Sequence, residues 1–174
     1  MKNKMTGIML LAALFASASV QATDNLQFRG NLVIPNCTIN NNQPFTIDWG
    51  DVEIQTFDIP HIAYHVKEES IYLDCPYYYN TPKLTLTGNN GGRDNYIQTS
   101  KHDEGLAISV RQGAWGNNKP VPLGQKTNIA SDAISGTGRN KYLRLGFALT
   151  RTKKIEDLTP GEFTASANLE VRYE

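Results

Sequence analysis

Apolar and polar residues alternate along both ends of this 174-residue chain. An alternation with a period of two predicts a β-strand that buries one face. The C-terminal run comprises Phe163, Ala165, Ala167, Leu169, Val171 and Tyr173. The N-terminal run comprises Leu26, Phe28, Gly30 and Leu32. Two such strands at opposite ends of one chain suggest a function that is itself strand pairing between molecules.

Shorter alternating runs fill the sequence between these ends. They comprise Phe45, Ile47 and Trp49, then Val52 and Ile54, then Ile71, Leu73 and Cys75, then Leu84 and Leu86, then Leu106, Ile108 and Val110, and finally Leu143, Leu145, Phe147 and Leu149. Many short strands separated by breaks rich in Gly, Asn and Pro predict an all-β sandwich or barrel. Residues 56–69 and 124–140 are expected to be loops or edge segments. No core helix is expected after the first 22 residues.

The first 22 residues have the pattern of a secretory leader. Lys2 and Lys4 precede an apolar run over residues 7–20, and Ala22 closes a cleavage site of small residues. The run is shorter than the roughly 20 apolar residues that a membrane-spanning helix needs. We therefore expect a signal peptide at residues 1–22 and an exported, soluble mature chain.

The charge of the mature chain is nearly balanced. Without Lys2 and Lys4, 15 of the 17 basic residues remain against 17 acidic ones, and no long block of either sign occurs. Binding to nucleic acid requires a basic patch, so no nucleic-acid partner is expected.

The only two cysteines, Cys37 and Cys75, both lie in the exported part. In an oxidising compartment such a pair most simply forms a disulfide. A metal site is the alternative, but two cysteines without a nearby histidine pattern make a weak one. Closing the loop between them would stabilise the fold by about 4 kcal/mol.

Candidate catalytic and metal-binding residues are sparse. His61 and His65 are four residues apart, a spacing that can bind a metal on a helix, but the local pattern favours a loop. The acidic residues Asp48, Asp51 and Glu53 fit a solvated strand face better than a carboxylate pair. No nucleophile motif or phosphate-binding loop is present. We expect neither enzymatic activity nor a cofactor nor a metal site.

Three adjacent tyrosines occupy residues 77–79, just after Cys75. Aromatic faces stack on sugars and anchor protein interfaces, so this run is a candidate contact site. The commoner role of such a run is a loop packed at the end of a sandwich.

Residues 24–38 and 48–56, the glycine fourteenth from the C-terminus (Gly161) and the penultimate aromatic residue (Tyr173) together carry a family resemblance. The chain resembles chaperone–usher pilus subunits, most closely those of the tip fibrillum of P pili. The two cysteines fit the disulfide of that family. The resemblance implies an immunoglobulin-like β-sandwich that lacks its last strand, which a strand from a chaperone or from the next subunit completes.

The resemblance also divides the mature chain into a donor-strand extension at residues 23–35 and a pilin domain at residues 36–174. Within the extension, Leu26, Phe28, Gly30 and Leu32 would fill successive pockets of a neighbour, with Asp24 at a shallow first position. The acceptor groove and chaperone contact are assigned to Gly161, Phe163, Ala165, Ala167, Leu169, Val171, Tyr173 and Glu174.

The partners that the resemblance implies are a periplasmic pilus chaperone, an outer-membrane usher, neighbouring pilus subunits and a possible host receptor. The implied route runs through the periplasm to the surface fimbrium of a Gram-negative bacterium, where the subunit supports cell adhesion. Two alternatives stay open within the same family. The protein could be a single-domain adhesin, with residues 77–79 as the first place to look, or a single-copy pilus adaptor.

Overall fold

The computed structural model describes residues 26–77, 79–117 and 119–173. The expected signal peptide at residues 1–22, Asp24, Tyr78 and Glu174 lie outside the described residues. In the described part of the chain, regular structure consists of β-strands and single 3₁₀ turns, without an α-helix. None of these turns is long and apolar enough to cross a membrane.

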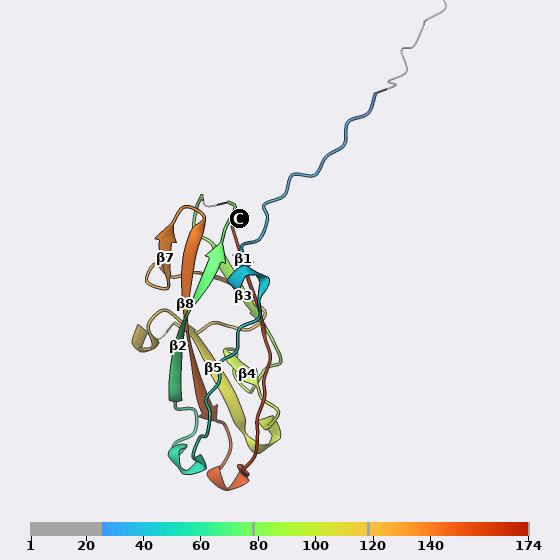
Figure 1. Ribbon diagram of the computed structural model, residues 1–174. Helices are drawn as coiled ribbons and strands as arrows, with labels where there is room; N and C mark the ends of the chain where they lie inside the picture. Colours follow the sequence, from blue (N-terminus) through green and yellow to red (C-terminus); the bar gives the residue numbers. More distant parts are fainter. Residues whose placement is uncertain (1–25, 78, 118, 174) are drawn as a thin grey trace, which may run out of the picture. The chain divides into compact units, whose positions relative to one another are not determined.

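The strands are short except for two long ones in the centre of the larger sheet (Figure 1). Their bounds are β1 Thr38–Ile39, β2 Tyr64–Asp74, β3 Lys83–Thr87, β4 Tyr96–Gln98, β5 Leu106–Gln112, β6 Lys126–Asn128, β7 Ile134–Thr137, β8 Asn140–Arg151 and β9 Asn168–Arg172. The 3₁₀ turns are η1 Asn40–Asn42, η2 Ile54–Thr56, η3 His102–Glu104, η4 Trp115–Asn117 and η5 Ile155–Asp157.

The chain forms two units, residues 1–32 and residues 33–174. The described part of the first unit, residues 26–32, contains no helix or strand. Every strand of the described residues belongs to the second unit, which we call the domain.

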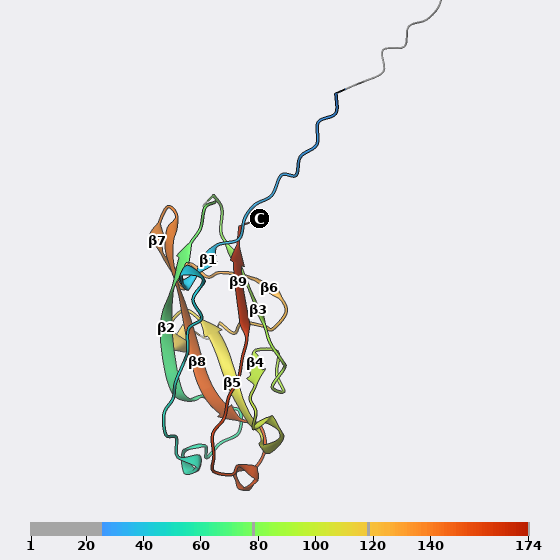
Figure 2. The ribbon, with the colours of Figure 1, turned by 45° about the vertical axis from the view of Figure 1, so that its right-hand side comes forward.

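Two antiparallel sheets make up the domain (Figure 2). The larger sheet has the order β1-β2-β8-β5-β4. A further strand, β7, pairs with the beginning of β8 on the same side of β8 as β5. The smaller has the order β6-β3-β9. The two sheets bury their facing sides against each other, as the expected all-β sandwich requires.

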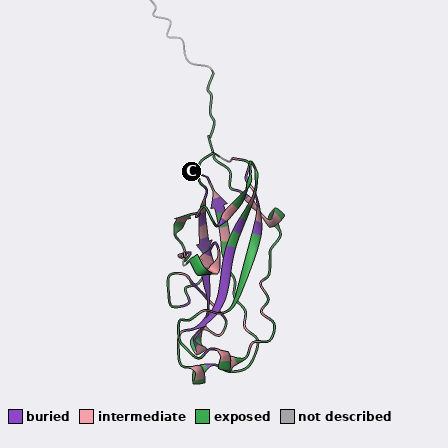
Figure 3. Ribbon diagram, turned by 90° about the vertical axis from the view of Figure 1, so that its left-hand side faces the viewer, coloured by how far each residue is buried: buried purple, intermediate pink, exposed green. Residues whose placement is uncertain are grey.

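Alternation places the core on the inner face of each strand. On β8, Leu143, Leu145 and Leu149 are buried, whereas Tyr142 and Arg144 point outward. The same period places buried apolar residues on other strands, among them Ile71, Leu73, Leu84, Leu86, Leu106, Ile108, Val110 and Val171. Figure 3 shows buried segments along the strands of the domain. The alternating runs therefore predicted the core correctly.

A disulfide joins Cys37 to Cys75, as expected, and fastens the start of the domain to the end of β2. Cys37 also donates its backbone N–H to the carbonyl of Val171 in β9 (2.8 Å). The residues that follow, in β1, pair with β2. The entry of the chain into the domain is thus bonded to both sheets.

Residues 56–69 correct one expectation. They were predicted as loops or edges, but β2 begins at Tyr64 and its residues 67–69 pair with the central strand β8. The side chains from His65 to Ser70 are all exposed, so no alternation marks this half of the strand. By contrast, residues 124–140 do contain edge strands, since β6 pairs only with β3 and β7 only with β8 among the described strands.

The alternating runs at residues 45–54 and 163–167 correct a second expectation. Both were predicted as strands, yet neither is paired in a sheet, and η2 begins at Ile54. The two segments run lengthwise along the domain (Figures 1 and 2). A strand needs a hydrogen-bonded neighbour, and at both segments the position of one neighbour is empty.

Candidate strand-binding groove

A groove with a volume of about 1510 Å³ runs along the domain between these two unpaired segments. Residues 42–57 form one side, which we call the first wall, and residues 158–169 form the second wall. Core side chains from both sheets form its floor, namely Leu86, Ile97, Leu106, Ile108, Leu145 and Phe147. The groove therefore opens the hydrophobic core itself to the outside.

The first wall presents alternate apolar side chains to the groove. Ile47 and Trp49 are half-buried, and Phe45 is 40% exposed. The Trp49 indole Nε1 donates to the carbonyl of His65 on β2 (2.7 Å), which anchors the middle of the wall. Within the described residues, positions 44–52 make no backbone-to-backbone hydrogen bond. Side chains bind two backbone groups of the wall, with Lys67 Nζ donating to the Asp48 carbonyl and the Gly50 N–H donating to Asp48 Oδ1, but the wall pairs with no described strand.

The second wall has the same character. Phe163 and Leu169 are half-buried, and Ala165 and Ala167 are exposed. Among described residues 162–167, only Thr164 makes a backbone-to-backbone hydrogen bond, accepting from the Ser100 N–H (2.8 Å). The two small alanines leave room above the floor for side chains that come from elsewhere.

Among the ring contacts of the described residues, only one joins the two walls. The rings of Trp49 and Phe163 lie 6.2 Å apart between centroids and are tilted by 43°. This ring pair links the two walls across the groove.

Such a groove fits an extended peptide. Unpaired backbone N–H and C=O groups on an edge are a template for a further strand. Two such edges facing each other, above an apolar floor, offer main-chain hydrogen bonds on both sides and pockets for alternate side chains. Small-molecule sites usually enclose about 300–1,000 Å³, so the groove is larger than those sites need.

A buried arginine fixes the end of the groove near Gly161. Arg151, the last residue of β8, is 6% exposed. Its guanidinium donates to the carbonyls of Phe57, Asp58 and Lys153. Phe57 ends the first wall, and Lys153 belongs to the loop before the second wall. One side chain therefore holds the bases of both walls.

An acidic residue makes a second anchor at this end. The Glu104 carboxylate accepts from the Thr159 backbone N–H (2.8 Å) and from the Lys101 ammonium (2.9 Å). The Thr159 N–H, followed by Lys101, lowers the pKa of Glu104 from 4.5 to about 2. Because Thr159 lines the groove, this contact fixes the start of the second wall to η3.

The predicted donor residues lie in the first unit and are exposed where described. Leu26, Phe28 and Leu32 are 67%, 87% and 104% exposed. A Cβ added at Gly30 would meet no atom within 4 Å. The local environment of the described extension therefore imposes no need for glycine at this position.

The predicted acceptor residues divide into two groups. Gly161 at φ +136°, Phe163, Ala165, Ala167 and Leu169 all line the groove. Val171 and Tyr173 do not line it, because they are buried in the core next to β3 and Tyr77. Burial raises the pKa of Tyr173. Glu174 lies outside the described residues.

The first wall was missed as part of the acceptor site. Its signal was present in the sequence, in the alternation of Phe45, Ile47, Trp49, Val52 and Ile54. Alternation alone does not tell which strand is absent beside it. The two walls lie more than a hundred positions apart, so their proximity emerges only from the fold.

The three tyrosines are described only in part. Tyr77 is half-buried and packs edge-on against Tyr173 (6.1 Å between centroids), whereas Tyr79 is 62% exposed. Packing of Tyr77 on the core supports the structural role over a contact role for this residue.

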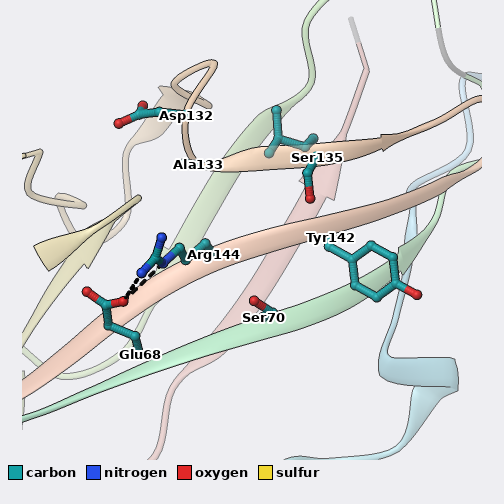
Figure 4. Close-up of a pocket in the computed structure, with 8 residues that line it drawn as sticks. Glu68, Ser70, Asp132, Ala133, Ser135, Tyr142 and Arg144 are labelled. Atoms are coloured by element: carbon teal, nitrogen blue, oxygen red, sulfur yellow. Dashed lines mark hydrogen bonds and ion pairs between the residues drawn. The ribbon is translucent and has the colours of Figure 1, made fainter.

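A second hollow, of about 380 Å³, lies on the outer face of the larger sheet (Figure 4). Its lining is mostly polar and comprises Glu68, Ser70, Asp132, Ala133, Ile134, Ser135, Tyr142 and Arg144. Glu68 accepts from the Trp115 N–H (2.7 Å) and from Arg144 Nε (3.0 Å), and these contacts lower its pKa. Glu68 and Arg144 pair with each other and Asp132 pairs with Lys119, as on a solvated sheet face, and the hollow lies on the side of β8 opposite the groove floor.

The described residues contain no cluster of three or more His, Cys, Asp or Glu suited to a metal ion. The two histidines have separate partners. The His61 ring stacks on Tyr96 (6.2 Å between centroids), and His65 Nε2 lies 2.8 Å from Thr56 Oγ1. His61 lies in a loop as expected, but His65 belongs to β2.

Among known proteins, the family model of fimbrial proteins matches residues 26–174 of the chain. The chain belongs to the fimbrial protein family. This fimbrial chain is 31% identical over 179 residues to fimbrial protein PrsE of Escherichia coli, covering 98% of the chain and 99% of PrsE. It is 27% identical over 169 residues to the fimbrial adapter PapF of Escherichia coli, covering 95% of the chain and 96% of PapF.

Solved structures show the same fold. A structure of the P pilus adaptor subunit PapF matches with a TM-score of 0.55 and 24% identity, covering 83% of this chain and 100% of that one. The P pilus rod subunit PapA matches with a TM-score of 0.57 and 22% identity, covering 86% and 99%. The fimbrial chain is thus an immunoglobulin-like β-sandwich without its last strand, and the groove marks the place of that strand.

Proposed function

We propose that the protein is a structural pilus subunit that polymerises by donor-strand exchange. The N-terminal extension of one copy fills the groove of the next and supplies the missing strand. The observation that carries this proposal is the groove itself, in which two unpaired backbone edges face each other above an exposed core. Its role is structural, without catalysis.

The extension has the side chains that such a groove requires. Leu26, Phe28 and Leu32 share one face of an extended strand and are exposed in the free extension. Their full burial would contribute roughly 5–9 kcal/mol, at about 1.5–3 kcal/mol each. That sum is comparable with the total stability of a small domain. Gly30 shares this face, and its lack of a side chain lets the backbones approach closely.

The open groove also requires a partner before polymerisation. An exposed core with two free edges is an aggregation hazard. A periplasmic chaperone would fill it with a strand of its own and contact Glu174. An outer-membrane usher would then exchange that strand for the extension of the next subunit. The fibre would be displayed on the surface of a Gram-negative cell and support adhesion.

Two complementary variants test the proposal. Phe28→Asp with Leu32→Asp disables the extension, and Ala167→Trp blocks the groove. A matched control, Gln27→Asp with Asn31→Asp, places the same charges on the outward face of the strand. Each disabled variant alone should stay monomeric, the two together should form a 1:1 dimer, and the control should polymerise like the wild type. Normal polymers from a disabled variant, or no dimer from the mixture, would refute donor-strand exchange.

The adaptor role is the second candidate, because PapF is similar over nearly the whole chain. A repeating subunit accepts its own extension, whereas an adaptor joins unlike neighbours. Long homopolymers of the wild-type chain would favour the repeating role. Assembly that stops without a second kind of subunit would favour the adaptor.

A further inference from the structure

Two apolar residues of the extension lie beyond the residues that are expected to fill the groove. Val33 and Ile34 follow Leu32 directly and are 75% and 43% exposed. Alternation assigns the groove pockets to the residues up to Leu32. A second apolar pair is exposed on the domain, where Ile59 and Ile62 are 54% and 47% exposed.

Ile59 and Ile62 lie in the loop that continues from the first wall. Phe57 still lines the groove, and the loop after it lies at the end of the domain away from the C-terminus (Figures 1 and 2). Arg151 and Tyr64 hold this loop. The guanidinium of Arg151 binds the Asp58 carbonyl, and the Ile59 N–H donates to the Tyr64 hydroxyl (2.9 Å). The two isoleucines are therefore presented on a loop that is bonded to the sheet.

The direction of the incoming strand decides whether Ile34 meets Ile59 and Ile62. A strand parallel to the second wall would bring the next subunit to the Tyr173 end. There the receiving chain enters its own domain, since Cys37 N–H bonds the Val171 carbonyl. An antiparallel strand brings the next subunit to the Gly161 end instead. In that direction the next subunit does not meet the point where the receiving chain enters its own domain. Each receiving subunit keeps its own extension free, and successive subunits form an open head-to-tail fibre.

In the antiparallel direction, Leu32 lies at the Gly161 end of the groove and the chain continues past the last wall residues. Ile34 is then about 7 Å beyond Leu32 in an extended segment. Pro35 disfavours a helical turn at Ile34 and keeps it extended. The loop after Phe57 borders the same end of the groove, so Ile34, on the same face as Leu32, comes within reach of Ile59 and Ile62.

We propose that Ile34 of the incoming subunit, which shares the inward face of Leu32, packs against Ile59 and Ile62 of the receiving subunit, a contact that we call the apolar latch. The partner is a second copy of this chain, and the inference rests on the proposed donor-strand exchange. The latch lies outside the groove and removes three exposed apolar side chains from water. It slows withdrawal of the strand and stiffens the joint between successive subunits.

Cross-linking in a defined dimer tests the latch. The donor copy carries Ile34→Cys with the blocking Ala167→Trp, and the receiving copy carries Ile59→Cys with the disabled extension. A short bismaleimide should join the two new cysteines in high yield. A receiving copy with Ser135→Cys, an exposed residue on the outer face of the larger sheet, should remain unlinked.

A second variant measures the effect. Ile59→Ser with Ile62→Ser changes exposed residues, so the receiving domain should fold normally. Dimers that contain it should dissociate about tenfold faster in denaturant. A dimer that forms but does not cross-link, with an unchanged dissociation rate, overturns the latch and leaves donor-strand exchange standing. Failure of the dimer to form overturns both.

Discussion

Truncating Phe28 should weaken the joint between subunits far more than truncating its neighbour. The Phe28 side chain is 87% exposed in the free extension and would be buried in the groove of the next subunit. Full burial of a phenylalanine is worth about 1.5–3 kcal/mol. Each 1.4 kcal/mol is about a factor of ten, so Phe28→Ala should weaken the joint roughly 10- to 100-fold.

The assay uses the 1:1 dimer of a donor copy with a blocked groove and a receiving copy with a disabled extension. Preformed dimers are diluted into guanidinium, and the rate of dissociation is followed. Most changes in affinity at one interface appear in this rate. The matched control is Arg29→Ala, whose side chain is on the outward face and should change the rate less than about threefold.

The contrast between the two variants decides the outcome. A large effect for Phe28 and a small one for Arg29 is expected from one buried face. Equal effects, or a larger effect for Arg29, would refute the assignment of Leu26, Phe28 and Leu32 to the buried side of the donor strand.

Three further predictions concern the domain. Arg151→Met should lower the free energy of unfolding by about 3 kcal/mol in a urea titration, because three backbone carbonyls, that of buried Phe57 among them, lose a charged donor; an unchanged midpoint would contradict its anchoring role. Replacing Cys37 and Cys75 by alanine opens a loop with a sequence separation of 38, which should cost about 4 kcal/mol of stability; a loss below 1 kcal/mol would count against it. The pKa of Glu104 is about 2 in the folded protein and 4.5 ordinarily, so its contacts stabilise the fold above pH 4.5 and are lost as the pH falls toward 2. Urea unfolding of Glu104→Gln should therefore show a smaller loss of stability between pH 5 and pH 2 than the wild type, and parallel pH profiles would exclude this contribution.

The core of the sandwich was predictable because its signal is local. Leu143, Leu145, Phe147 and Leu149 alternate in the sequence and lie on one face of β8. The exposed half of β2 was not predictable, since long-range pairing with β8 defines it and all its side chains but Val66 are polar.

Only the second wall of the groove was predictable as part of an acceptor site. The alternation of Phe163, Ala165, Ala167 and Leu169 indicates an apolar face, and family resemblance indicates an acceptor. The opposite wall, with Trp49 at its centre, comes from a distant segment whose alternation looked like that of an ordinary strand. Both walls carry the alternation of a strand, which the proposed donor strand would pair with on both sides.

The most direct test of donor-strand exchange uses a domain that lacks residues 23–33 and a synthetic peptide of that sequence. The domain is refolded with and without the peptide, and thermal melting is followed. Burial of about 5–9 kcal/mol should raise the melting temperature by roughly 10–30 °C. A truncated domain that melts at the same temperature with and without the peptide would show that its fold is already complete, and would contradict the account.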